Sequence, residues 1–467
     1  MNTVVLKWGG SVLQHARDLS ALKNTVADYE GRRVVVVSAL QGVTDSLERL
    51  LNSVPIGAEE IAKAGKRLYD NHALLLTQTK CDTEEALHTL RARIEVFEQY
   101  LTLCDTLGYV PADARDAVLS FGERLASCVL TAVLAEKDQI VKEALPEDVG
   151  LVTDGRFGDA EVNLDVAREY VSRSLSEGVV YVVPGFYGVS QEGRVTLFGR
   201  GGSDYTAAVL ACCLHAETAD FFKDVPGFMS ADPKFVHDAV PISRLNYDEA
   251  AELTCFGAKI LHPGAVSLLK HFSIAARIYN VRHYRGADNP ESVIGKETQQ
   301  TEGALKSVAF TDNCAVIQFA GTSVGIKPGI LADITTVFSR SGINIKTVLT
   351  SLTAINVLVA STDVPLCREL FAHARIVSVD DIAIDDDVSL IAAVGSGINE
   401  HHGILARILK ALSEKEINVR MFSAGASSCA VYVIVRRADR NEAVNAAHSA
   451  LLVRKKEGVD EKVKNYR

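Results

Sequence analysis

Residues 196–207 read Thr-Leu-Phe-Gly-Arg-Gly-Gly-Ser-Asp-Tyr-Thr-Ala, and this combination suits the binding of an anion. Three glycines within four residues let the backbone approach a ligand closely. Arg200 offers a guanidinium fork for a carboxylate or a phosphate. Ser203 and Asp204 follow at the expected start of a helix, where free amide groups favour anions, and Asp204 can orient a metal, a lysine or a hydroxyl group. An ordinary glycine-rich loop with an aspartate cap is the alternative.

Two further segments place polar groups directly after expected strands. Lys7 ends the first strand and precedes Gly9 and Gly10, whose backbone can wrap a phosphate, although the GxxxxGK[ST] pattern of a P-loop is absent. Residues 36–45 run from a valine-rich strand into a loop with the hydroxyl groups of Ser38 and Thr44. A plain strand-to-helix turn, in which Thr44 or Asp45 caps the helix, explains the second segment equally well.

Three more segments carry charged residues in unusual settings. Glu123 follows a glycine inside a long helical stretch, where glycine is unfavourable. Residues 223–234 leave a strand with Lys-Asp and then turn at Pro-Gly and at Asp-Pro. Lys259 lies in the apolar run 256–263, and its neighbour His262 has no second ligand at metal-binding spacing, so we interpret His262 as structural.

The composition narrows the class of protein. The 467 residues suffice for two to four domains, and the formal net charge of −10 argues against a nucleic-acid or anionic-membrane partner. Nine scattered cysteines without CxxC spacing fit a reducing cytoplasm. The N-terminal residues enter a strand-like run directly, which predicts no signal peptide, and no uncharged apolar run reaches the length of a membrane span.

The elements that position these residues follow from hydrophobic patterning. Short valine-rich runs predict buried strands, and longer amphipathic stretches predict helices. The expected strands are 4–7, 33–37, 179–184 and 219–223, and the expected helices are 18–30, 58–76, 83–104, 112–136 and 204–215. This alternation predicts an α/β domain with a mainly parallel sheet, sandwiched by helices, that binds ligands at the carboxyl ends of its strands.

An internal repeat marks the C-terminal part. Residues 329–346 align with residues 403–420, with eight of the eighteen positions identical in the sequence. Each copy is an amphipathic helix followed by Ile-Asn-Ile or Ile-Asn-Val and a new strand, which is typical of paired domains. The copies resemble ACT domains, which are βαββαβ modules that bind amino acids; two modules that only hold subunits together are the alternative.

Together the six segments and the repeat resemble aspartate kinases of the amino-acid kinase superfamily. The resemblance runs in order from Lys7 to about Asn280 and continues through the repeats. It implies a kinase domain at 1–295, a linker at 296–304, and ACT-like modules at 305–385 and 386–467, with copies that can interleave. It also implies transfer of the γ-phosphoryl group of ATP to the side-chain carboxylate of L-aspartate, with Mg²⁺, at the start of lysine, threonine, methionine and isoleucine biosynthesis.

The resemblance assigns roles by position. Lys7 and Asp204 match the catalytic pair, and Asp204 has an orienting role because an ionised carboxylate needs no general base. Glu123 matches the residue that takes the substrate ammonium, and Arg200 the one that binds its α-carboxylate, with Ser38, Thr44 and Ser203 completing the substrate pocket. The implied nucleotide-binding residues are Lys7, Gly9, Gly10, Lys223, Asp224, Met229, Lys234 and Lys259.

Departures from the family pattern concern regulation above all. Lys223 stands where the family often has threonine, and Met229 where it often has tyrosine near adenine. Lysine-sensitive relatives carry acids where this chain has Lys346 and Leu352, which predicts weak or absent inhibition by lysine. The implied regulatory positions are Gly329, Ile330, Leu331, Lys346, Ser351 and Leu352.

Two other functions remain open at this point. A relative that phosphorylates another acid, such as glutamate or acetylglutamate, is disfavoured because Glu123 and Arg200 suit a free α-amino acid and because the ACT pair favours aspartate. A catalytically silent amino-acid sensor is disfavoured because Lys7, Arg200, Asp204 and Lys259 are all present. We therefore expect a cytoplasmic aspartate kinase, dimeric through its ACT modules, without a resident metal site.

Overall fold

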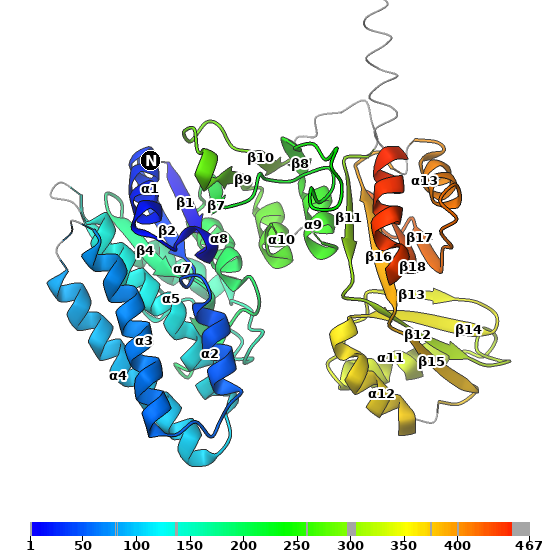
Figure 1. Ribbon diagram of the computed structural model, residues 1–467, viewed down its shortest axis with the longest axis horizontal. Coiled ribbons are helices and arrows are strands. Elements are labelled where there is room, and N and C mark those ends of the chain that lie inside the picture. Colours follow the sequence, from blue (N-terminus) through cyan, green and yellow to red (C-terminus); the bar gives the residue numbers. More distant parts are fainter. Residues whose placement is uncertain are drawn as a thin grey trace, which may run out of the picture. The chain divides into compact units, whose positions relative to one another are not determined.

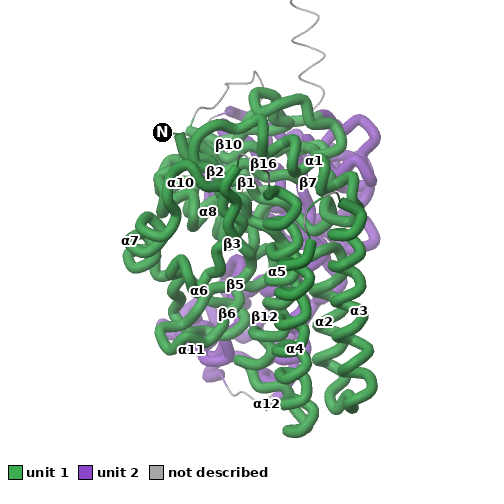
Figure 2. The backbone as a smooth tube through the Cα atoms, turned by 90° about the vertical axis from the view of Figure 1, so that its left-hand side faces the viewer, with its two compact units in different colours: residues 1–228, 241–254, 259–299 green, residues 229–240, 255–258, 300–467 purple. Residues whose placement is uncertain are grey.

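A computed structural model of the chain describes residues 2–79, 81, 83–135, 139–257, 260–296, 305–373, 376–398 and 401–450. The chain divides into two compact units, which Figure 2 distinguishes by colour. Unit 1 comprises residues 1–228, 241–254 and 259–299, and unit 2 comprises residues 229–240, 255–258 and 300–467. Two short segments of the first 295 residues therefore belong to unit 2.

Unit 1 is built on an eight-stranded sheet in the order β3-β4-β2-β1-β7-β9-β10-β8 (Figure 1). Every neighbouring pair is parallel except β9 and β10, which are antiparallel. The strands are β1 Thr3–Trp8, β2 Arg32–Val37, β3 Val141–Glu143, β4 Val180–Pro184, β7 Thr218–Lys223, β8 Arg244–Asn246, β9 Ala275–Asn280 and β10 Ser292–Gly295. The predicted α/β class is confirmed, because valine-rich strands of this kind are buried on both faces.

Helices cover both faces of this sheet. The five predicted helices appear, with ends shifted by a few residues, and a small hairpin of β5 Tyr187–Val189 and β6 Val195–Leu197 lies beside the sheet. The helices of unit 1 are α1 Ala16–Ala27, α2 Val43–Leu51, α3 Ala58–Thr77, α4 Glu84–Leu107, α5 Ala112–Leu134, α6 Pro146–Val149, α7 Leu164–Ser174, α8 Gly202–Cys213, α9 Tyr247–Cys255 and α10 Pro263–Phe272.

The two faces of β1 show how the sheet sorts its side chains. Leu6 and Trp8 point into the main apolar core with helix α5, whereas Lys7 points to the opposite face and contacts Asp204 on helix α8. This alternation is the ordinary two-residue period of a strand. A charged residue in an otherwise apolar strand is thereby directed out of the core and towards the edge where ligands bind.

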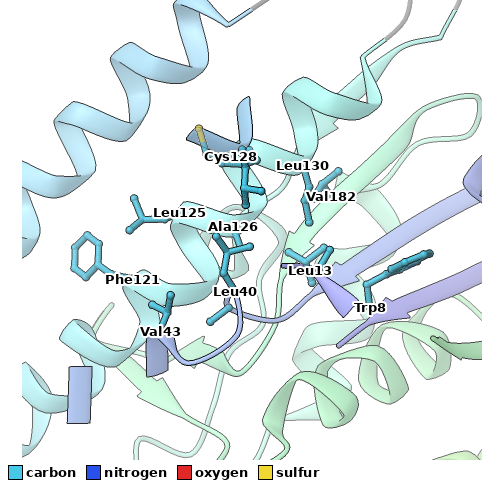
Figure 3. Close-up of a cluster of buried hydrophobic side chains, with 14 of the residues drawn as sticks. Trp8, Leu13, Leu40, Val43, Phe121, Leu125, Ala126, Cys128, Leu130 and Val182 are labelled. Atoms are coloured by element: carbon cyan, nitrogen blue, oxygen red, sulfur yellow. The ribbon is translucent and has the colours of Figure 1, made fainter. Parts of the chain in front are cut away.

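Helix α5 forms the centre of the apolar core of unit 1. Figure 3 shows its side chains Phe121, Leu125 and Leu130 gathered with Trp8 and Val182 from the sheet. Among the described residues, α5 is the one helix long and apolar enough to cross a membrane by length and composition, and 83% of its most apolar stretch is buried inside the protein. Its apolar character therefore serves the core.

Unit 2 contains two four-stranded antiparallel sheets, in the orders β13-β14-β12-β15 and β11-β16-β18-β17. The first carries helices α11 Ile330–Arg340 and α12 Val364–His373, and the second carries α13 Ile404–Ser413 and helical residues 440–450. The strands are β11 Ser307–Thr311, β12 Ala315–Ala320, β13 Thr347–Thr350, β14 Ala354–Val359, β15 Asp381–Asp385, β16 Val388–Val394, β17 Met421–Ala424 and β18 Ala430–Arg436.

The second sheet takes its edge strand from earlier in the chain. In the first module the order is β12-α11-β13-β14-α12-β15, and β15 pairs with β12. In the second module β11, which precedes the whole first module, pairs antiparallel with β16 in the equivalent place. The two copies are therefore interleaved in the chain, although each sheet is complete in space.

The segment 229–240 is anchored within unit 2. Ala231 and Val236 belong to the apolar core of the second module, and the hydroxyl group of Ser230 lies 2.8 Å from Nε2 of buried His448. The backbone of Ser230 also accepts a hydrogen bond from the Val308 amide. The chain after β7 therefore contributes directly to the packing of the C-terminal module.

Gly122 has a specific packing function in helix α5. A Cβ atom at this position would lie 2.7 Å from the Cβ of Ala39 and 3.4 Å from a methyl group of Val43. Only a glycine lets the helix come this close to the loop between β2 and α2. The unfavourable glycine in the helix thus brings Glu123 next to the loop that carries Ser38 and to Thr44 in the first turn of α2.

We predict that Gly122→Ala destabilises the protein although alanine favours helices. Overlap with Ala39 should lower the free energy of unfolding by about 1–3 kcal/mol, because overpacking outweighs the gain of about 1 kcal/mol in helix propensity. Urea denaturation measures this change. The matched control is Gly65→Ala in α3, where the new Cβ meets only the flexible side chain of Glu98. Equal or greater stability of Gly122→Ala would contradict the packing argument.

Candidate active site

A cavity of about 920 Å³ opens in unit 1 where β1, β2 and β7 end, which is the edge at which parallel sheets bind ligands. It brings together most of the residues that the sequence singled out. Those that line it are Lys7, Gly10, Ser38, Thr44, Glu123, Arg200, Ser203, Asp204 and Lys223. They come from five separate stretches of the chain, at residues 7–10, 38–44, 123, 200–204 and 223.

The carboxylate of Asp204 bridges two lysines. Its Oδ1 lies 2.8 Å from Nζ of Lys7, and its Oδ2 accepts a hydrogen bond of 3.0 Å from Nζ of Lys223. Lys7 comes from β1 and Lys223 ends the neighbouring parallel strand β7, so the sheet itself brings the two ammonium groups together. All three side chains are less than 15% exposed.

The electrostatics of this group follow from burial and charge. Burial alone would raise the pKa of Asp204, but the charges of Lys223 and Lys7 outweigh it and hold that pKa at about 2. Burial lowers the pKa of Lys223, with Asp204 opposing this change and Lys7 adding to it. Two ammonium groups thus share one carboxylate, which leaves the cluster with an excess of positive charge.

Glu123 faces the cavity with an unsatisfied carboxyl group. Its Oε2 is buried and has no hydrogen-bond partner among the described residues. Burial raises its pKa to about 8, against the opposing effects of the Ala39 backbone and Lys7. A buried polar atom without a partner is unfavourable in an empty site, so Glu123 is poised to pair with a cationic group of a ligand.

The glycine-rich loop places Arg200 at the mouth of the cavity. Gly199 and Gly201 have φ values of 70° and 83°, a conformation that favours glycine, and Arg200 between them is exposed. Gly201 is the N-cap of helix α8, so the alternative in which Asp204 caps the helix is wrong. Asp204 lies instead in the first turn, free to receive the lysines.

Helix α2 shows the same pattern. Its N-cap is Gly42, with φ 78°, so the alternative that Thr44 or Asp45 caps this helix is also wrong. Thr44 lies in the first turn and lines the cavity, together with Ser38 at the end of β2. The side chain of Thr44 is therefore available to a ligand instead of being used as a cap.

Asp116 is a site residue that the sequence analysis missed. Its Oδ2 accepts hydrogen bonds from the amides of Gly158 (2.8 Å) and Leu197 (2.9 Å), which ties helix α5 to the hairpin strand that leads into the Arg200 loop. Burial raises its pKa. The available signal was an acidic residue among apolar helix positions, where a charged side chain usually has a partner.

In the loop after β1, not every backbone amide is free to bind a phosphate. The Gly9 amide donates to the Phe222 carbonyl at 3.3 Å, so it is engaged within the fold, while a Cβ at Gly10 would meet the Ala39 carbonyl at 2.5 Å. The hydroxyl group of Ser11 donates to Asp224 at 2.9 Å and joins this loop to the end of β7. Trp8 is fully buried, stacked on Phe222 at 4.9 Å.

Three of the implied nucleotide-binding residues lie elsewhere or are not described. Met229 and the exposed Lys234 belong to unit 2, and the Met229 carbonyl accepts a hydrogen bond from Ser307. Lys259 lies outside the described residues. The roles of these three residues stay predictions.

His262 lines the cavity without being placed as a metal ligand. Its Nδ1 accepts the Gly264 amide at 3.2 Å as the N-cap of α10, its ring packs against Tyr205, and burial lowers its pKa. No group of three or more His, Cys, Asp or Glu side chains suited to a metal occurs in the part of the chain that the structure describes.

The implied regulatory residues lie in the first module of unit 2. Gly329, with φ 95°, caps α11, whose first residue Ile330 is buried. The Ser351 hydroxyl group is bonded to the backbone of Ala354. The ammonium group of Lys346 donates to the carbonyl of Asn313, and burial lowers its pKa.

Two leucines complete this region. Leu331 and Leu352 are 40% and 65% exposed, and the Leu352 carbonyl accepts the Gly325 amide. The described regulatory positions thus include two exposed apolar side chains and the half-buried Lys346.

Comparisons with known proteins give the family of this chain. The profile of the Amino acid kinase family matches residues 2–280, and that of an ACT domain matches residues 391–451. An aspartokinase of Geobacillus stearothermophilus is 29% identical over 73% of this chain and 84% of its own length. Aspartokinase 3, chloroplastic, of Arabidopsis thaliana is 27% identical over 96% of this chain and 81% of its own.

A solved structure extends the likeness to the fold. The E. coli aspartokinase III structure in complex with aspartate and ADP has a TM-score of 0.84 at 25% identity, and the match covers 96% of this chain and all of that one. The family match alone spans more than half of the chain. The chain therefore belongs to the amino acid kinase family, within its aspartokinase group, and carries a C-terminal ACT region.

Proposed function

We propose that this chain transfers the γ-phosphoryl group of ATP to the β-carboxylate of L-aspartate, giving 4-phospho-L-aspartate and ADP. The observation that carries this proposal is one cavity that holds both Glu123, a buried carboxyl group whose Oε2 has no hydrogen-bond partner among the described residues, and a lysine–aspartate–lysine cluster. The first suits the ammonium group of an amino acid. The second suits the negative charge of a phosphoryl group in transfer.

The substrate roles follow from charge. Glu123 pairs with the α-ammonium group, and Arg200 takes the α-carboxylate with its bidentate fork. Ser38, Thr44 and Ser203 offer hydroxyl groups to the remaining polar atoms of aspartate. Together these groups require both charges of a free α-amino acid, which disfavours an N-acylated substrate.

The reaction itself needs no general base. An oxygen of the ionised β-carboxylate attacks the γ-phosphorus, the bond from that phosphorus to the β–γ bridging oxygen breaks, and its electron pair leaves with ADP. Lys7 neutralises charge on the transferring group, and Asp204 holds its ammonium group in place. Positioning and charge supply the catalysis.

The nucleotide is assigned to the residues at the ends of β1 and β7. Gly9 and Gly10 shape the loop after β1, Lys223 ends β7, and Asp224 follows it. The resemblance alone assigns Lys234 and Lys259 to the nucleotide and Met229 to the neighbourhood of adenine. Mg²⁺ fits as an ion carried by ATP, because Asp204 is occupied by two lysines and Asp224 is the exposed carboxylate beside them; it supplies charge neutralisation at the phosphates.

We also propose a homodimer through the ACT modules and a cytoplasmic location, with service in amino-acid biosynthesis. The exposed Leu331 and Leu352 support the use of the first module as a contact surface. Aspartokinase 3 of Arabidopsis thaliana is a chloroplastic relative.

The first test is aspartate-dependent turnover. With Mg-ATP and L-aspartate, the acyl phosphate trapped by hydroxylamine should appear in step with ADP, and Lys7→Met should lower kcat by about 10²-fold or more. Arg200→Met should act mainly on KM for aspartate, by about tenfold or more, since it binds a carboxylate that does not react. ADP release with glutamate but not with aspartate would refute the assignment of aspartate as the substrate.

The pKa of Glu123 predicts how aspartate binding depends on pH. Near neutral pH in the empty site this carboxyl group is mostly protonated, because burial raises its pKa to about 8. Ionised Glu123 is the form that binds ammonium, so KM for aspartate should fall by about tenfold per pH unit as pH rises towards 8, then level off. Steady-state kinetics between pH 6 and 9 measure this.

Glu123→Gln is the matched control for the pH profile. It keeps the shape of the side chain but cannot ionise, so KM should be higher and independent of pH in this range. The same variant should gain stability relative to wild type as pH rises from 5 to 8, since the folded state of the wild type retains a proton that the unfolded state releases. A pH-dependent KM that persists in Glu123→Gln would refute the assignment.

Regulation by lysine is expected to be weak or absent. Lys346 places a cation in the first module, and like charges disfavour a lysine ligand, so millimolar lysine should inhibit by less than about twofold. Parallel assays with threonine and methionine test for another effector. The E. coli aspartokinase III structure in complex with lysine and aspartate concerns that relative only. Strong inhibition of this chain by submillimolar lysine would contradict the prediction.

A further inference from the structure

The second lysine on Asp204 is more than a contact for a bound nucleotide. Lys223 lies 3.0 Å from Oδ2 of Asp204, on the opposite carboxylate oxygen from Lys7. Its place at the end of β7, next to β1 in the sheet, holds its ammonium group beside that of Lys7. The two lysines and their carboxylate form one buried unit on the cavity wall.

The hydrogen bonds of Lys223 leave part of its capacity unused. An ammonium group has three N–H donors, and the described residues provide one hydrogen-bond acceptor for Lys223, which is Asp204. The side chain is only 14% exposed, so water meets the remaining donors poorly. Buried donors of a charged group are normally paired, which indicates that a ligand acceptor completes the site.

The charge count points to the kind of ligand. Asp204 is shared by two ammonium neighbours, Glu123 is mostly protonated when the site is empty, and the exposed Asp224 is a further carboxylate that acts on Lys223. Burial and the charge of Lys7 lower the pKa of Lys223, against the opposing charges of Asp204 and Asp224. A ligand that brings negative charge between the two lysines would favour their charged forms.

We propose that Lys223 is a catalytic residue that contacts the transferring γ-phosphoryl group together with Lys7, with Asp204 clamping both lysines from behind. This inference rests on the proposed phosphoryl transfer. Charge on the oxygens of the transferring group is best met by fixed cations on more than one side. In this role Lys223 supplies charge and transfers no proton, and the bonds that form and break are those already given.

A structural role for Lys223 would also link it to Asp204. In that case the lysine would act only by holding the carboxylate, and removing it would be no worse than removing Asp204. A role limited to nucleotide binding would weaken ADP and a transition-state analogue equally. Each of these two roles therefore predicts a result that differs from the one expected if Lys223 contacts the transferring group.

The test compares Lys223→Met and Lys223→Arg with the wild type. Binding of ADP and of ADP–aluminium fluoride, each with Mg²⁺ and with or without L-aspartate, is measured alongside steady-state kinetics. We expect Lys223→Met to lose about 10²-fold in kcat and in affinity for the aluminium fluoride complex, with ADP affinity changed by less than about threefold. Lys223→Arg should recover part of the loss, because it restores the charge.

A double-mutant cycle separates contact from clamping. Lys223→Met combined with Asp204→Asn should bind the aluminium fluoride complex more weakly than Asp204→Asn alone. Equal binding by the double and single variants would overturn the proposal, as would parallel losses for ADP and the analogue in Lys223→Met. Urea denaturation of every variant verifies that each one is folded.

Lys63→Met is the matched control, since Lys63 is an exposed lysine of α3 in the same unit. It should match the wild type in both binding and turnover. Wild-type protein that binds the aluminium fluoride complex but shows no aspartate-dependent turnover would refute the proposed substrate. The binding cycle would still decide the role of Lys223.

Discussion

The site depends on one buried carboxylate that bridges two ammonium groups. Asp204 can meet Lys7 and Lys223 only because β1 and β7 are parallel neighbours and because helix α8 starts at their carboxyl ends. The rest of unit 1 supports this meeting. The apolar faces of the strands pack on α5 and direct Lys7 to the other side, and the glycines at 199 and 201 turn the chain into α8 at the required place.

Several charged groups of this site are buried, and their burial lowers the stability of the folded protein. A chain of net charge −10 repels anionic substrates at long range, so the attraction has to come from local cations that are withdrawn from water. Burial also raises the pKa of Glu123 to about 8 and leaves its Oε2 without a hydrogen-bond partner among the described residues. Unsatisfied buried groups of this kind destabilise a folded protein, which is a common origin of the trade-off between stability and activity.

A short segment of unit 2 follows strand β7 of unit 1 closely in the chain. Residues 229–240 follow β7 directly, yet Ala231 and Val236 pack in the second ACT module and Ser230 bonds to His448. This segment is covalently continuous with Lys223. The second sheet is likewise completed from an earlier part of the chain, because β11 precedes the first module.

The sequence by itself determined the local features of this protein. Valine-rich strands, amphipathic helices, the glycine-rich loop and the repeat follow from periodicity and turn chemistry, which short stretches of chain contain. The resemblance of the motifs added the family. Only the tertiary structure decided that Lys223 pairs with Asp204, that Ser11 meets Asp224 at 213 residues' separation, and that β11 completes the second sheet. Asp116 and Gly122 likewise acquire their roles only from partners on other elements. Such contacts depend on which strands become neighbours and in which register, and no local pattern encodes that choice.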